Sequence, residues 1–235
     1  MQDFGGAFLD AFRLVLALDP ALMEIVGLSL RVSLTAVLLS GLIGLPLGAL
    51  IAVLRFPGRG LLIVFLNTMM GLPPVVVGLA VYLLLSSAGP LGVLQLLYTP
   101  GAMILAQCIL VTPLVAALTL QTVSDLQQEY DEQLRSLGIG PLGSVFTLLW
   151  DGRYSLMTAL LAGFGRATAE VGAVLIVGGN INHVTRVMTT TIALETAKGN
   201  LALALGLGAV LIAIALLVNG LVMALRAAAA RLSYA

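Results

Sequence analysis

The sequence has very little charge for its length. Only 9% of its 235 residues are Asp, Glu, Lys or Arg, and 60% are hydrophobic, whereas about 25% of the residues in a soluble domain are charged. This number of charged side chains is too small to cover a surface that faces water. The lipid bilayer must therefore be the solvent of this chain. The net charge is zero, and no basic tract suggests a nucleic acid as a partner.

The sequence also lacks the motifs of enzymes and metal sites. The single cysteine, Cys108, lies in an apolar run and cannot form an internal disulfide. There is no glycine-rich phosphate loop with a following lysine, no HExxH motif and no cysteine pair. His183 has no acidic or thiol neighbour at ligand spacing, so we assign it no metal. Residues 1–17 lack the basic start and the cleavage site of a signal peptide.

Five apolar stretches reach the length of about 20 residues that a helix needs to cross a bilayer. They are residues 30–54, 61–85, 99–123, 154–177 and 201–225. Only a helix satisfies its own backbone in lipid, so we expect an all-α membrane protein with one transmembrane domain, residues 1–235. Residues 4–18 are short for a crossing and predict a helix in the membrane interface, with a sixth span as the alternative.

Lysine and arginine in short loops indicate which side of the membrane is cytoplasmic. One side has Arg55, Arg59, Arg135, Arg153, Arg226 and Arg231, and the other has Arg13, Arg186 and Lys198. This bias places the amino terminus outside and the carboxyl terminus in the cytoplasm.

The same bias places residues 125–153, the one long polar interruption, in the cytoplasm. Five charged residues crowd its first part, which we expect to be helical and to stop at Gly138-Ile139-Gly140-Pro141. A short helical loop between two spans is a docking surface on one face of the membrane.

Breaks and charges inside the spans have two readings each. Pro73-Pro74 near the middle of the second span indicates either helix packing or a kinked wall of a transport path. Arg166 and Glu170, four residues apart in the fourth span, predict an ion pair on one helical face, either structural or lining a substrate path.

The segment after the fourth span contains Gly178-Gly179-Asn180 and then Thr185 and the run Thr189–Thr191. The paired glycines predict the end of a helix. The rest is either a capped outer loop or a set of backbone amides and hydroxyls that contact an oxyanion.

The cytoplasmic loop resembles the EAA loop of ABC importer permeases, whose pattern is EAA-x3-G-x9-I-x-L-P. Glu132 takes the glutamate position, Gly138 the glycine position and Leu148 the isoleucine position, and the sequence departs from the pattern at Gln133, Leu134, Trp150 and Asp151. In that family the loop forms two short coupling helices in a cleft of the ATPase. The resemblance implies ATPase coupling by Glu132, Leu134, Gly138 and Leu148.

The resemblance extends over residues 28–220, and GRATAEVGAVLIVGGNI followed by TRVMTTTIALE is most similar to tungstate-type permeases. It carries over Arg166, Glu170, Gly172, Ala173, Gly179 and Asn180, and we assign Arg166, Glu170, Gly179, Asn180, Pro73 and Pro74 to the translocation path or gate.

The resemblance implies an importer of a tetrahedral oxyanion in a bacterial or archaeal plasma membrane, with tungstate first, molybdate second and sulfate not excluded. The expected partners are two copies of a cytoplasmic ABC ATPase, which binds ATP and Mg, an external oxyanion-binding protein and a second copy of the chain. The chain itself is expected to be no enzyme and to hold no cofactor. The alternatives are a secondary transporter without an ATPase and a membrane scaffold protein.

Overall fold

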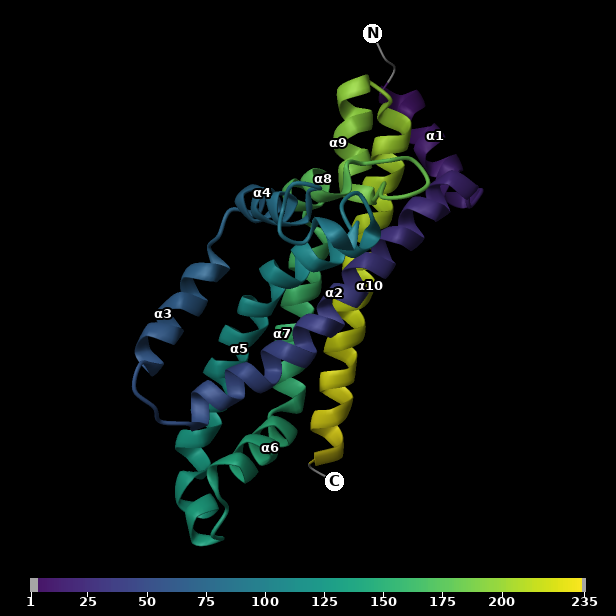
Figure 1. The fold of residues 1–235 in the computed structure, drawn as a ribbon. Helices are drawn as coiled ribbons and strands as arrows, with labels where there is room; N and C mark the ends of the chain where they lie inside the picture. Colours follow the sequence, from purple (N-terminus) through teal and green to yellow (C-terminus); the bar gives the residue numbers. More distant parts are fainter. Residues whose placement is uncertain (1–3, 234–235) are drawn as a thin grey trace. The chain divides into compact units, whose positions relative to one another are not determined.

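The computed structural model describes the backbone of residues 4–233 and the side chains of residues 9–224. Within these residues the chain is helical and contains no strand (Figure 1), which confirms the predicted all-α class. The helices are α1 (Phe4–Leu16), α2 (Pro20–Val53), α3 (Arg59–Met70), α4 (Pro74–Leu85), the 3-10 helix η1 (Gly92–Leu94), α5 (Pro100–Ser136), α6 (Pro141–Asp151), α7 (Arg153–Thr168), α8 (Gly172–Gly178), α9 (Met188–Lys198) and α10 (Leu201–Ser233).

Three of the described helices, α2, α5 and α10, are long and apolar enough to cross a membrane, and up to five spans exist if α3 with α4 and α7 with α8 each count as one. The sequence predicts one span over 61–85, with a kink at Pro73-Pro74 as one reading, and one span over 154–177; in the structure each of these segments is a pair of helices with a sharp bend between them. Pro46 and Pro113 lie inside continuous helices, but Pro73 precedes and Pro74 begins a new helix. Proline lacks an N–H and suits the first helical position.

Two helical segments go beyond the sequence prediction. Helix α5 continues to Ser136, so the charged part of the polar loop is the end of a long helix. Residues Met188–Lys198, which the sequence pattern predicts as part of an outer loop, form α9. The hydroxyl of Thr190 accepts the Val187 N–H at the start of α9, at 3.3 Å, so threonine satisfies a backbone donor where the helix begins.

The backbone groups into two compact units, each made of segments far apart in the sequence. Unit 1 contains residues 1–35, 73–107 and 168–219, and unit 2 contains residues 36–72, 108–167 and 220–235.

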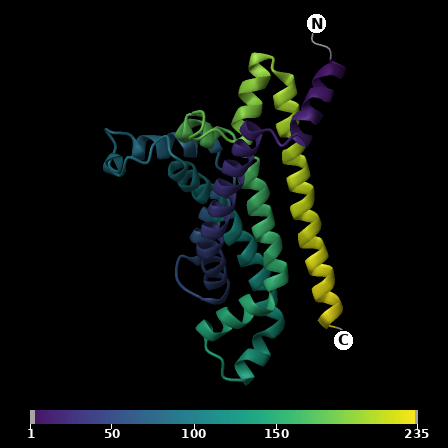
Figure 2. The ribbon, with the colours of Figure 1, turned by 90° about the vertical axis from the view of Figure 1, so that its right-hand side faces the viewer.

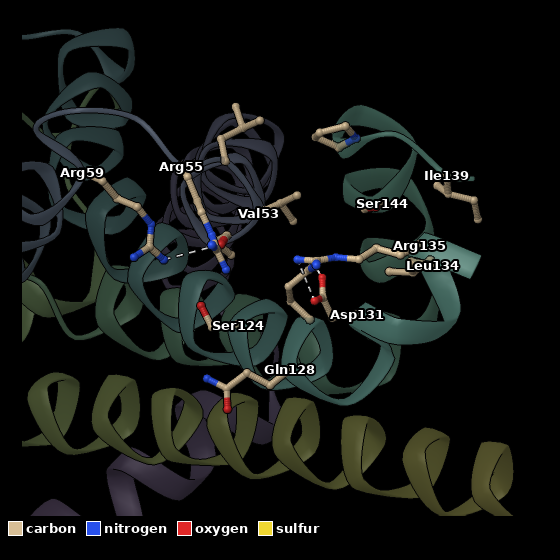
Figure 3. Close-up of a pocket in the computed structure, with 14 residues that line it drawn as sticks. Val53, Arg55, Arg59, Ser124, Gln128, Asp131, Leu134, Arg135, Ile139 and Ser144 are labelled. Carbon is tan, nitrogen blue, oxygen red and sulfur yellow. Dashed lines mark hydrogen bonds and ion pairs between the residues drawn. The ribbon is translucent and has the colours of Figure 1, made fainter. Parts of the chain in front are cut away.

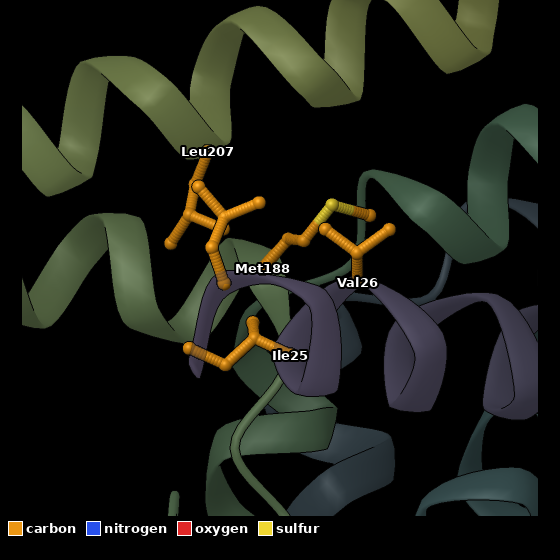
Figure 4. Close-up of a cluster of buried hydrophobic side chains, with 5 residues drawn as sticks. Ile25, Val26, Met188 and Leu207 are labelled. Carbon is orange, nitrogen blue, oxygen red and sulfur yellow. The ribbon is translucent and has the colours of Figure 1, made fainter. Parts of the chain in front are cut away.

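The core of unit 1 joins the start of α2 to α9 and α10. Its fully or nearly buried side chains are Leu22, Ile25, Val26, Met188 and Leu207 (Figure 4). Beside them Ser29 Oγ accepts the Met188 N–H at 2.7 Å and donates to the Ile25 carbonyl at 2.7 Å. One hydroxyl therefore ties the first turn of α9 to α2.

Helices α4 and α8 of unit 1 lie side by side (Figures 1 and 2). A Cβ atom on Gly78 would lie 2.7 Å from the Cα of Ala173. The two backbones therefore approach more closely than any residue with a side chain would allow.

Unit 2 packs in the same manner along α2, α5 and α7. A Cβ on Gly44 would lie 3.1 Å from the Cβ of Val115, and one on Gly163 would lie 2.9 Å from Val111 Cγ1. Ile51 of α2, Leu66 of α3 and Ala116 and Leu120 of α5 form one buried cluster. The span glycines of α2 thus act in packing within this unit.

We predict that Gly48→Ala destabilises the protein, because its Cβ would meet the Ala116 carbonyl and come within 2.8 Å of Thr119 Cβ. Overpacking of this kind costs about 1–3 kcal/mol. Gly27→Ala, in the same helix with nothing within 4 Å of the added Cβ, should be neutral or stabilising. Thermal melting of both variants in detergent checks this, and equal melting temperatures would contradict it.

Candidate functional site

The polar segment of unit 2 is a helical hairpin formed by the end of α5 and by α6. The Ile139 N–H donates to the Leu134 carbonyl at 3.0 Å, and the Gly138 N–H donates to the Arg135 carbonyl at 3.0 Å. Gly138 has a φ of +66°. These two bonds and the left-handed residue form a Schellman motif, so Gly138 is present because the chain must turn there.

The four residues assigned to ATPase coupling lie in two kinds of place. Glu132 and Gly138 are exposed. Leu134 and Leu148 are buried in a cluster with Ala49, Val123 and Val145, which joins α6 to α5 and to the end of α2. The two leucines therefore hold the hairpin together and do not face outward.

The outward face of α6 has a row of apolar side chains that is not among the site residues predicted from the sequence. Leu142, Phe146 and Trp150 are 64%, 74% and 72% exposed. They are spaced four residues apart on one helical face, and Val145 and Leu148 occupy the buried face. This spacing, visible in the sequence, is the signal that identifies the row. We call these three residues the α6 ridge.

Neighbouring side chains hold the end of the ridge in place. Arg153 Nη1 donates to the Trp150 carbonyl at 2.6 Å, and its guanidinium lies 4.9 Å from the Trp150 ring centroid and 4.5 Å from that of Tyr154. On α5, the charges of Glu129 and then Asp151 raise the pKa of Tyr130 above its ordinary value. That phenol stays protonated and packs against the hairpin core.

In unit 1, Glu170 lies between α7 and α8 and bonds to both following helices. Its side-chain Oε1 accepts the Ala173 N–H at 3.0 Å, and its carbonyl accepts the Thr189 hydroxyl at 2.9 Å. Its side chain is buried. Glu170 thus satisfies a backbone donor at the start of α8 and links it to α9.

The starts of α4 and α8 meet beside Glu170. Pro73 is exposed and Pro74 is half-buried. A Cβ on Gly172 would lie 2.8 Å from Val75 Cγ2. The structure therefore brings Pro73, Pro74 and Glu170, three of the predicted path residues, to one region of unit 1.

At the other end of α8, Gly179 and Asn180 turn the chain, with φ angles of +70° and +50°. A Cβ on Gly179 would lie 2.9 Å from Tyr98 Cδ1. Asn180 Oδ1 accepts the Thr190 hydroxyl at 2.9 Å, while Thr185 Oγ1 accepts the Ile181 N–H at 2.9 Å. Gly179 ends the helix as expected, and the amide and hydroxyl groups of this turn are bonded to each other.

The position of Arg166 differs from the sequence expectation. Helix α7 ends at Thr168 and Glu170 lies beyond it, so the two residues do not share the helical face that an unbroken span would give them. Arg166 is half-buried, and among the described residues it makes no hydrogen bond or ion pair. The helix is broken between Thr168 and Gly172, and this break separates Arg166 from Glu170. Glu170 then caps the new helix α8.

Known proteins similar to this chain are membrane transport proteins. A probable anion ABC transporter permease protein of Haloferax volcanii is 42% identical over 205 residues, which cover 85% of this chain and 88% of that protein. The tungstate uptake system permease protein of Peptoclostridium acidaminophilum is 38% identical over 226 residues, or 96% of this chain and 99% of that protein. The chain belongs to the ABC importer permease family.

A sulfate transport system permease protein of Escherichia coli K12 is a more distant relative of this permease, 29% identical over 170 residues, which are 69% of this chain and 58% of that protein. No protein-family model matches the chain. In this permease the polar segment consists of the end of the long helix α5 followed by the short helix α6.

We predict that Glu170→Ala lowers the melting temperature of the permease, because the Ala173 N–H loses its acceptor. The expected cost is about 1 kcal/mol, as for the loss of other helix caps. Glu170→Gln keeps a carbonyl oxygen at that place and should melt within about one degree of the parent. Thermal unfolding in detergent measures both, and equal losses in the two variants would argue against capping by Glu170.

Proposed function

We propose that this permease is the membrane-spanning subunit of an importer that carries tungstate into the cytoplasm and is driven by ATP hydrolysis on a separate subunit. The observation that carries the proposal is the 38% identity that runs over 96% of this chain to a protein named as a tungstate uptake system permease. A second tungstate uptake permease, from Campylobacter jejuni, is 42% identical over 65% of this chain. Molybdate, which has the same charge and shape, is the second candidate cargo.

The α6 ridge supports a cytoplasmic ATPase as the partner. Contiguous exposed apolar side chains outside the lipid mark a protein-protein contact, and aromatic residues dominate the energy of such contacts. The apolar part of α5 ends near Val123, and from there to Ser136 the helix extends by roughly 20 Å. The hairpin turn and the start of α6 therefore lie outside the bilayer, and α6 runs back from there until Leu148 packs with Val123.

The hairpin can transmit movement because it is packed as one body. Leu134 and Leu148 fix α6 to α5, and Ala49 brings in the end of α2. When ATP binding closes two ATPase subunits, a push on Phe146 and Trp150 moves α5 and α2 with them. The energy comes from the ATPase, and the permease supplies two conformations for it to bias.

We assign the path of the anion to Arg166, Glu170, Gly179, Asn180, Pro73 and Pro74. The support is chemical: Arg166 is a half-buried cation without a described partner, and a charge in a span costs about 2.5–3.5 kcal/mol, which favours a functional role. Affinity for the cargo belongs to an external binding protein, because a path that bound the anion tightly would not release it.

The remaining parts of the proposal concern assembly and topology. One chain has one α5–α6 hairpin, so two copies of the permease are needed to engage two ATPase subunits. The arginine bias places this hairpin and the carboxyl terminus in the cytoplasm and the amino terminus outside a bacterial or archaeal plasma membrane. ATP and Mg bind the ATPase, and the permease itself catalyses no reaction.

We predict that Phe146→Ala weakens ATPase binding by about tenfold, the loss expected for an aromatic hot spot. Phe65→Ala is the matched control, since Phe65 is 58% exposed on α3 and Phe146 is 74% exposed on α6. Affinity measured with the purified ATPase should differ between these variants, while their melting temperatures stay equal. If the chain were instead a scaffold that recruits another protein, or a transporter without an ATPase, the unmodified protein would not bind the ATPase.

The cargo is tested by reconstituting the permease with its ATPase and its binding protein in liposomes. Tungstate uptake should require ATP, and unlabelled sulfate should compete at least tenfold less well than tungstate, a difference of about 1.4 kcal/mol. The strength of competition by unlabelled molybdate shows how well the transporter accepts this second candidate cargo relative to tungstate. Sulfate uptake as fast as tungstate uptake would reject the cargo while leaving the importer mechanism intact.

A further inference from the structure

Unit 2 contains an open cavity of about 810 Å³ beside the α5–α6 hairpin (Figure 3). Its walls come from the end of α2 and the connection to α3, from one face of α5, and from the start of α6. None of the path residues and none of the α6 ridge residues line it. A cavity of this size is in the range of small-molecule sites.

The cavity has an excess of positive charge. Arg55, Arg59 and Arg135 line it against one acidic residue, Asp131. Asp131 is bound to Arg135 at 2.9 Å. Arg59 donates from Nε to the Ile51 carbonyl at 2.7 Å and thereby caps the end of α2.

Arg55 is left over, since it is exposed and forms no hydrogen bond or ion pair with a described residue. Figure 3 shows the side chains of Arg55 and Arg135 entering the cavity from opposite walls. Like charges that face each other are unfavourable unless an anion lies between them, and the paired Asp131 offsets only one of them. The wall therefore matches a phosphate-type group, to which guanidinium donors bind well.

Asp131 is held by a second neighbour as well, since Gln127 Nε2 donates to Asp131 Oδ1 at 2.9 Å. The carboxylate is therefore already bonded by Arg135 and by Gln127. Arg55 is the cation of this cavity that remains for a ligand.

We propose that this cavity binds the phosphate headgroup of an anionic phospholipid, such as phosphatidylglycerol. The phosphate lies between Arg55 and Arg135. The apolar lining residues Val53, Leu54 and Ile139 face the glycerol and the start of the acyl chains. Basic pockets at the cytoplasmic ends of membrane helices bind anionic headgroups in this way.

The place of the cavity favours a lipid over a soluble oxyanion. Helix α2 ends at Val53 after its apolar run, so Arg55 lies at the level of the headgroups if α2 spans the membrane as proposed above. A bare tetrahedral oxyanion would fill only a small part of the cavity of about 810 Å³. The lipid site does not depend on which anion is transported.

The test uses the full chain, titrated in detergent with phosphatidylglycerol or phosphatidylcholine and observed by native mass spectrometry. We expect several-fold tighter binding of phosphatidylglycerol, and a loss of about fivefold in Arg55→Gln, the effect of about 1 kcal/mol for one basic residue near an anionic surface. Arg55→Lys should keep most of the preference. The matched control is Arg31→Gln, another exposed arginine, on α2 outside the cavity, which should change nothing.

Since Arg55 has no partner among the residues with described side chains, its replacement should leave the melting temperature unchanged, and a change in binding then reports the loss of the lipid contact. Equal binding of the two lipids, or equal losses in Arg31→Gln and Arg55→Gln, would overturn the site. Displacement of the lipid by millimolar inorganic phosphate or tungstate would assign the cavity to a soluble oxyanion instead. If Arg55→Gln leaves lipid binding intact and weakens ATPase binding, the cavity serves the ATPase, and the lipid proposal is wrong.

Discussion

The constraint on which the structure depends is that lipid offers no hydrogen bonds to the backbone. The long helices α2 and α5 satisfy their own backbone groups along their length. At every break between helices, the free N–H and C=O groups must be bonded by other groups of the protein. At the break before α4, the Gly71 N–H donates to the Thr68 carbonyl at 3.1 Å, and Pro74 has no N–H to satisfy. At the break before α8, Glu170 accepts the Ala173 N–H, and Thr189 donates to the Glu170 carbonyl. Side-chain and backbone groups of Glu170 and Thr189 therefore supply the hydrogen bonds that this interruption requires.

The same reasoning explains why α6 is apolar on two faces. One face packs through Val145 and Leu148 into the core with α5 and α2, as any short helix needs in order to be stable. The other face, the α6 ridge, has no such internal reason and exposes large side chains at an energetic cost. Internal packing makes the ridge rigid, and the Schellman turn at Gly138 sets its direction. A rigid apolar surface on a short helix is suited to a partner protein that changes the conformation of the permease by moving that helix.

The sequence was sufficient for the helical class, for the apolar stretches and for the stop at Gly138, because hydropathy and turn chemistry are local properties. It was insufficient where a few residues outweigh a long apolar run. The pattern over 154–177 reads as one helix, but a side chain at Glu170 that caps a new helix breaks it. It also missed α9, whose first turn is held by Ser29, 159 positions away. Leu134 and Leu148, chosen by pattern, are core residues, and burial cannot be read from a motif.

The cavity and the α6 ridge share one helix, which has a consequence for regulation. Ile139, Pro141 and Ser144 line the cavity, while Leu142 and Phe146 point outward from the same turns. A headgroup held between Arg55 and Arg135 bridges the end of α2 to α5 close to the start of α6. If the ATPase moves α6 relative to α2 during the cycle, the two conformations differ in their affinity for that headgroup. Linkage is reciprocal, so the lipid then biases the conformation to the same extent that the ATPase changes lipid binding. The lipid composition of the membrane would thus affect the coupling of the ATPase to the permease, through the distance between Arg55 and Arg135.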